Sequence, residues 1–211
     1  MNYGGNNDVN NNTCPRCGKS CDTHRPFAFI SSDQKTEELV RKLQGNLDEV
    51  ITRALVKGFD KSRETCMVGS AIATINSRVY QYVTISGAKT ELLTQMKQNL
   101  GKDVRVITSA SGLPLKTIQG KTLEPQPIRQ NRNRDYPLGS CAAQKLLMSV
   151  FNQAQSSGGA DKLTKLSMAE LLWCDSTTGE GHNRDWSTGE IVCSCDTCKQ
   201  VIPMMLCSAE L

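Results

Sequence analysis

Residues 137–147 read Pro137-Leu138-Gly139-Ser140-Cys141-Ala142-Ala143-Gln144-Lys145-Leu146-Leu147, which places a cysteine at the start of an amphipathic helical pattern. Residues 193–199 read Cys193-Ser194-Cys195-Asp196-Thr197-Cys198-Lys199 and open a second helix. The N-terminus of a helix lowers the pKa of a cysteine and favours its thiolate, so two such ends that face each other would bind a soft divalent cation. We therefore predict a zinc ion held by Cys141, Cys195 and Cys198, with a fourth position open for water.

The length of 211 residues is enough for a sizeable core, in one domain with an appendage or in two small domains. No apolar run is long enough to span a bilayer, and the first residues lack the charged and apolar regions of a signal peptide. We therefore expect a cytoplasmic protein with no membrane partner. A toxin domain that is delivered by a dedicated machinery would have the same features.

A second group of metal ligands is predicted near the start of the chain. The sequence has ten cysteines, and C-x2-C spacing without a signal peptide favours metal binding over disulfides. A C-x2-C-x3-C-x2-H pattern predicts a closed, structural zinc site with four protein ligands, namely Cys14, Cys17, Cys21 and His24. The alternative is a flexible tail with incidental thiols. Three isolated cysteines should be buried small side chains, those of Cys66, Cys174 and Cys207.

Composition and periodicity divide the chain into three parts. Residues 1–12 are rich in Asn and Gly and should be disordered, and residues 13–32 form the Cys-rich, zinc-knuckle-like segment. Residues 33–211 alternate between helical and strand patterns and should form an α/β domain. The sequence predicts helices over 36–59, 90–100, 140–155 and from 195 onward, an antiparallel hairpin of strands 67–75 and 79–85, and strands over 104–108 and 163–174.

Single residues refine these elements. We expect Ser140 to cap its helix, Gly58 and Gly101 to end theirs, and Pro203 to kink or shorten the last helix. The 163–174 run contains a Ser-x-x-Glu pattern that resembles a helix capping box, but its apolar residues favour a buried strand.

A basic region precedes the first metal-ligand helix. From Lys89 to Arg134 there are nine Lys or Arg and three Asp or Glu, so this window carries +6 while the whole chain carries +4. Such a patch is expected of a protein that meets phosphates, although a solvated loop is the alternative. We predict that nucleic acid contacts the basic side chains of the 109–136 loop, with two aromatic rings for base stacking. These residues are Lys116, Lys121, Arg129, Arg132, Arg134, Tyr136 and Trp186.

The order helix, β-hairpin, helix with Cys-x-x, strand, helix with Cys-x-x-Cys resembles the zinc-dependent cytidine deaminase superfamily. Its signature is His or Cys, any residue, Glu, and then Pro-Cys-x-x-Cys. Cys141 matches the first ligand and Cys195 and Cys198 match the pair, and the cysteine after Gly-Ser is most similar to the YwqJ-type bacterial toxin deaminases. The resemblance implies a small three-layer α/β/α fold over residues 33–211, with an antiparallel β-hairpin at the start of the sheet. It also implies a cognate immunity protein as a partner.

Three features depart from the family pattern. Ser194 stands where Pro is usual, the chain stops at Leu211 so that we expect a small sheet, and Ala143 occupies the place of the catalytic Glu. In the chemistry that the resemblance implies, zinc activates water for attack on C4 of cytosine or C6 of adenine, and the Glu transfers the protons. Alanine carries no proton, so we predict binding without measurable turnover. Ala143 belongs either to a natural pseudoenzyme or to a deliberate replacement, which we favour because the rest of the site is present.

The leading hypothesis is therefore a cytosine deaminase of nucleic acid that is inactive as written. Single-stranded DNA is the first expected substrate because a deaminase must reach an unstacked base. RNA, double-stranded DNA and free nucleotides are alternatives. A different class of function is a non-catalytic, zinc-stabilised binding module, in which both metal sites are structural and Cys193 supplies a fourth ligand.

Overall fold

The structure is a computed structural model that describes residues 2–3, 13–55, 65–87, 90–108, 114–124, 137–174, 189–191 and 195–209. Its centre is a six-stranded mixed sheet of order β1-β2-β8-β3-β4-β5, and β6 and β7 form a separate hairpin. The helices are α1 (Gln34–Leu55), α2 (Thr90–Leu100), α3 (Ala142–Ser156) and α4 (Asp196–Leu206). The strands are β1 (Asn2–Tyr3), β2 (Ile30–Ser31), β3 (Thr65–Ile75), β4 (Arg78–Ile85), β5 (Val104–Val106), β6 (Leu115–Lys116), β7 (Thr122–Leu123) and β8 (Leu163–Cys174).

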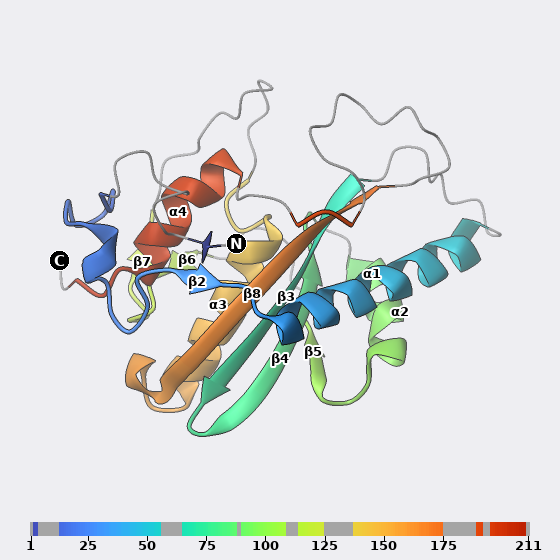
Figure 1. Cartoon of the computed structure of the whole chain (residues 1–211), viewed down its shortest axis with the longest axis horizontal. Coiled ribbons are helices and arrows are strands. Elements are labelled where there is room, and N and C mark those ends of the chain that lie inside the picture. Colours follow the sequence, from blue (N-terminus) through green and yellow to red (C-terminus); the bar gives the residue numbers. More distant parts are fainter. Residues whose placement is uncertain are drawn as a thin grey trace.

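Helices cover both faces of the sheet (Figure 1). α1 and α2 pack on one face, in a core that includes Leu43 and Met96. α3 and α4 pack on the other face, in a core that includes Leu146, Phe151 and Ile202. The predicted α/β class is therefore confirmed, with one helical layer on each face. Among the described residues, no helix combines the length and the apolar character needed to cross a bilayer.

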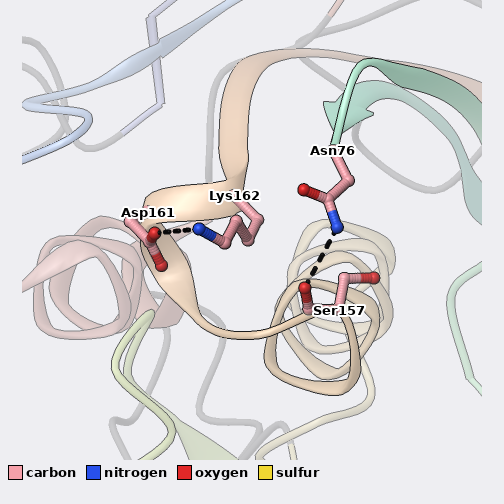
Figure 2. Close-up of polar contacts among 4 residues, drawn as sticks. All are labelled: Asn76, Ser157, Asp161 and Lys162. Atoms are coloured by element: carbon pink, nitrogen blue, oxygen red, sulfur yellow. Dashed lines mark hydrogen bonds and ion pairs between the residues drawn. The ribbon is translucent and has the colours of Figure 1, made fainter.

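The predicted hairpin of β3 and β4 is confirmed. Its turn residues Asn76 and Ser77 have φ values of 50° and 62°, the left-handed conformation that a two-residue hairpin turn of type I′ requires. The turn is fixed to the C-terminal end of α3, because Asn76 Nδ2 donates to the Ser157 carbonyl at 3.2 Å (Figure 2). The ion pair of Asp161 and Lys162 lies beside this contact.

β8 runs antiparallel to β3 along the whole length of both strands. The strand predicted over 163–174 is thus confirmed, and the capping-box alternative is wrong. Successive residues of a strand point to opposite faces. Met168 belongs to the core under α3 and α4, while Ala169 belongs to the core under α1 and α2. Glu170 therefore points to the same face as Met168, toward α3.

The N-terminal part of the chain joins the sheet, which the sequence did not predict. Asn2 and Tyr3 form β1 and pair with β2, so these two residues are ordered, contrary to the expectation for residues 1–12. The rest of that segment lies outside the described residues. β2 pairs in turn with Ser167 of β8. The expectation of a small sheet is therefore wrong, because short N-terminal strands extend it beyond β8.

Several element ends follow the predicted signals. α2 ends before Gly101, whose φ is 92°. α4 continues past Pro203 to Leu206, so the proline does not end it. The region predicted as a loop over 109–136 contains the β6–β7 hairpin. Gly58 lies outside the described residues.

Gly69 of β3 lets the start of α3 approach the sheet closely. A Cβ at this position would lie 3.0 Å from Leu146 Cδ1 and 3.1 Å from Ala142 Cβ. Both of these α3 side chains are fully buried, so neither can move away at low cost. The absence of a side chain at Gly69 therefore sets the distance between the sheet and the helix start at Cys141.

The substitution Gly69→Ala should lower the free energy of unfolding by about 1–3 kcal/mol, because the added methyl group overpacks this contact. Gly45→Ala is the matched control, since Gly45 is exposed on α1 and a Cβ there meets nothing within 4 Å. Helix propensity predicts a gain of up to about 1 kcal/mol for that control. Urea unfolding followed by circular dichroism measures both variants. Unchanged stability of Gly69→Ala would contradict the close packing.

Candidate metal centre

Three cysteine side chains meet where α3 and α4 begin. Cys141 is the N-cap residue of α3, Cys195 is the N-cap residue of α4, and Cys198 lies in the first turn of α4. Their sulfur atoms all lie within 4.8 Å of one another, and the Sγ atoms of Cys141 and Cys195 are 3.6 Å apart. Sulfur ligands about 2.3 Å from a tetrahedral zinc lie about 3.8 Å from each other. The geometry fits a metal ion and is too long for a disulfide, whose S–S bond is about 2 Å.

The two helix starts differ in how their first N–H groups are satisfied. In α4, the Cys195 sulfur accepts from the backbone N–H of Cys198 at 3.4 Å. In α3, the Cys141 side chain makes no capping hydrogen bond. The prediction that Ser140 caps this helix is wrong, because Ser140 Oγ donates to the carbonyl of Pro137 at 2.5 Å. The start of α3 therefore needs an acceptor from another element.

Glu170 of β8 supplies that acceptor. Its Oε1 accepts from the backbone N–H of Ala143 at 2.9 Å, and its side chain is buried. A carboxylate at a helix N-terminus satisfies an N–H group and interacts favourably with the helix dipole. Sequence reasoning missed this role because Glu170 lies 27 residues from Ala143. The available signal was an acidic residue within the apolar run of a strand, on the side facing a helix.

Two further α3 side chains surround the three thiols. Gln144 Oε1 accepts from the N–H of Gly139 at 2.6 Å, and its Nε2 donates to Cys198 Sγ at 3.4 Å. Lys145 is buried and donates to the carbonyls of Ile85, at 3.1 Å, and Gly87. Gln144 therefore orients Cys198, as the outer groups of metal sites orient the ligands. Lys145 fixes α3 to the end of β4 and brings a positive charge near Cys141.

Crowding opposes ionisation of these thiols. Hydrogen bonding with Cys195, together with burial and the nearby Glu170 carboxylate, raises the pKa of Cys141. Hydrogen bonding with Cys141 and Cys195, together with burial, raises the pKa of Cys198 well above its ordinary value. The lowering expected from the helix starts alone is thus outweighed. Three thiols in one place become thiolates when a cation neutralises them, so metal binding should release protons.

A second group of ligand atoms gathers Cys14, Cys17, His24 and Cys207, again all within 4.8 Å of one another. This group corrects the predicted set of Cys14, Cys17, Cys21 and His24. Cys21 is buried beside the group but does not belong to it. Cys207, expected to be an isolated buried side chain, takes its place. Because His24 and Cys207 lie far apart in the sequence, no spacing pattern indicated this contact.

The predicted nucleic-acid residues are placed only in part. Lys116 and Lys121 lie at the β6–β7 hairpin, which contacts α3 at Met148 and Gln155. Met148 is about 10 Å along the helix from Cys141, so the hairpin packs on the later turns of α3. The other residues lie outside the described part of the chain, namely Arg129, Arg132, Arg134, Tyr136 and Trp186. Cys193 and Ser194 also lie outside it.

A surface hollow of about 450 Å³ lies on the same face of the sheet, beside the C-terminal half of α3. Tyr82, Arg105, Ser149 and Gln153 are among the residues that line it. The Arg105 guanidinium lies 4.5 Å from the centre of the Tyr80 ring and donates to Gln153. No cysteine lines this hollow. The candidate metal-binding residues are therefore the three cysteines and not the residues of the hollow.

Comparison of the chain with protein-family models, curated proteins and solved structures gives no match. The similarity to deaminases therefore stays a prediction from the motifs. What this chain does must be inferred from its own geometry.

Removal of the Glu170 carboxyl group should destabilise the start of α3. Glu170→Ala leaves the N–H of Ala143 without its acceptor and should lower the free energy of unfolding by about 1–3 kcal/mol. Glu170→Gln keeps an acceptor oxygen and loses only the interaction of charge with the helix dipole, about 1 kcal/mol or less. Urea unfolding of both zinc-loaded variants measures the difference. Equal stability of Glu170→Ala and the unsubstituted protein would contradict the capping role.

Proposed function

We propose that this chain is a zinc-dependent deaminase domain for cytosine in nucleic acid, and that it is inactive because residue 143 is alanine. The observation that carries the proposal is the meeting of Cys141, Cys195 and Cys198 at two helix starts. Within the described residues, no fourth Cys, His, Asp or Glu joins this group, which supports an open coordination position. The family motifs on these same helices give the reaction class.

The residues around the thiols have distinct roles in this proposal. The three thiolates hold the ion, Gln144 orients Cys198, and Glu170 fixes the backbone of the helix start. When bound, zinc supplies activation of water near neutral pH. Lys145 balances part of the negative charge of the thiolates from its buried position on α3.

Ala143 removes the proton-transfer group from this arrangement. It is the second residue of α3, two positions after Cys141, and its side chain is buried. Its N–H donates to Glu170, so one oxygen of that carboxylate is already engaged. We infer that the centre binds its metal and substrate but lacks the acid and base that deamination requires.

The substitution Ala143→Glu should create deaminase activity. A general acid-base group contributes about 10²–10⁴ in rate, so deamination of labelled oligonucleotides should become detectable in this variant. Ala143→Gln is the matched control, because it has nearly the same volume and no ionisable proton. Zinc content and circular dichroism establish that both variants fold. If folded, zinc-loaded Ala143→Glu deaminates neither DNA, RNA nor free cytidine, the enzyme proposal is wrong.

The nucleic-acid part of the proposal rests on the basic window before α3. Affinity for a single-stranded oligonucleotide should fall as salt rises, and joint replacement of Arg129, Arg132 and Arg134 by Ala should reduce the slope of log K against log salt by about 2. The matched control replaces three exposed basic residues of α1, which packs on the face of the sheet opposite α3, namely Lys35, Arg41 and Lys42. Fluorescence anisotropy at several salt concentrations measures each slope. An unaltered slope in the first variant would exclude these phosphate contacts.

A second candidate function is a non-catalytic, zinc-stabilised binding module, possessing the same metal centre. The observation that favours it is Ala143 itself, because a binding module needs no proton-transfer group. Such a protein would bind oligonucleotide or a protein partner, for example a cognate immunity protein, and Ala143→Glu would leave it without activity.

A further inference from the structure

Four ligand atoms of suitable chemistry meet at the end of α4, far from the first centre in the fold. They belong to Cys14, Cys17, His24 and Cys207, and all lie within 4.8 Å of one another. The Sγ of Cys17 is 3.7 Å from Nε2 of His24. Sulfur and nitrogen ligands of a tetrahedral zinc lie about 3.6 Å apart. Three sulfur atoms and one imidazole nitrogen complete a closed tetrahedral set.

The imidazole of His24 provides an independent reason to expect an ion. The side chain is only 2% exposed, and its Nδ1 has no hydrogen-bond partner among the described residues. A buried imidazole with so few polar partners is costly, and such groups are rare in native proteins. A zinc ion would bind at Nε2, the ring nitrogen 3.7 Å from the Cys17 sulfur, and Nδ1 would then carry the ring proton.

The surroundings of the four ligands suit a thiolate-bound cation. Arg16 Nη1 donates to Cys207 Sγ at 3.4 Å and to the carbonyl of Ala209 at 2.7 Å. Three thiolates and a divalent ion leave one negative charge, which the guanidinium balances. The turn between Cys14 and Cys17 closes through Gly18, whose N–H donates to the Cys14 carbonyl at 2.9 Å and whose φ is 69°.

We propose that Cys14, Cys17, His24 and Cys207 bind a structural zinc ion that ties the N-terminal segment to the end of α4. Figure 1 draws the blue segment that contains η1 (Cys21–Thr23) beside the red chain that follows α4. Other contacts link the same two segments, because Cys14 Sγ lies 3.8 Å from the carbonyl oxygen of Pro203 and Arg25 N–H donates to Ser208 Oγ at 3.3 Å. The ion closes a loop that spans nearly the whole chain.

This zinc also positions the first centre. α4 has 11 residues and is about 16 Å long, with Cys195 at its N-cap and Cys207 at its C-cap. A clamp on Cys207 fixes the end of the helix whose start carries Cys195 and Cys198. The inference does not depend on deaminase activity, since it concerns only metal binding and the placement of α4.

Zinc content of purified variants tests the ligand set. The unsubstituted protein should contain two zinc ions per chain, Cys207→Ala should contain one, and Cys21→Ala should contain two. Cys21 and Cys207 are equally buried, at 1% and 0% exposure, so the pair is matched in burial and differs in the proposed ligation and in the contact of Cys207 with Arg16. Two zinc ions in Cys207→Ala, or loss of one in Cys21→Ala, would overturn the proposal. So would unsubstituted protein that contains one zinc ion and a disulfide at Cys207.

Two more measurements keep the test decisive. Cys207→Ala should melt at least about 5 °C below Cys21→Ala, because it loses a link between the chain ends; equal melting temperatures would contradict the clamp. In a chelator competition, the zinc ion that Cys207→Ala retains should be held about 10-fold more weakly than the corresponding ion of Cys21→Ala. If the chelator removed the retained zinc ion equally easily from both variants, the proposed effect of Cys207 on the first centre would be refuted. Cys17→Ala, at a less buried ligand, repeats each measurement if Cys207→Ala does not fold.

Discussion

The candidate metal centre depends on the register that pairs Gly69 of β3 with Glu170 of β8. On one strand the absence of a side chain lets α3 come close, and on the next strand a carboxylate meets the N–H of Ala143. A shift of one residue in this pairing would turn Glu170 to the opposite face. The N–H of Ala143 would then lose its acceptor, although Gly69 would keep its place under α3.

Three polar side chains are tolerated in a buried position near this register because each has a hydrogen-bond partner. Glu170, Gln144 and Lys145 are all buried, and each is paired with a backbone group. Their hydrogen bonds satisfy the loop before α3, its first turn and the end of β4. Such a network is stable only when its members are satisfied together, so these hydrogen bonds fix the backbone around the three thiols.

Much of the fold could be predicted from the sequence because its signals are local. The hairpin turn at Asn76 and Ser77, the apolar run of β8 and the stop at Gly101 each depend on neighbouring residues. The three thiols of the first centre were predicted because helix starts are visible in the sequence. Glu170 and Cys207 were missed in these roles, since each acts through a contact between distant segments. Spacing favoured Cys21 over Cys207, but the turn of η1 (Cys21–Thr23) places His24 in the group without Cys21.

The short strands at the margins of the sheet have a further consequence. On one side of the sheet, β8 pairs with β2 only at Ser167, and it contacts the segment 189–191 through Leu171 and Leu172. On the other side, β4 pairs with β5, which has three residues. These brief pairings interrupt the rows of backbone N–H and C=O groups that a long strand presents at its outer side. Edge-to-edge association requires a continuous row. Within the described sheet, these margins are therefore poorly suited to pair with the strands of a second chain.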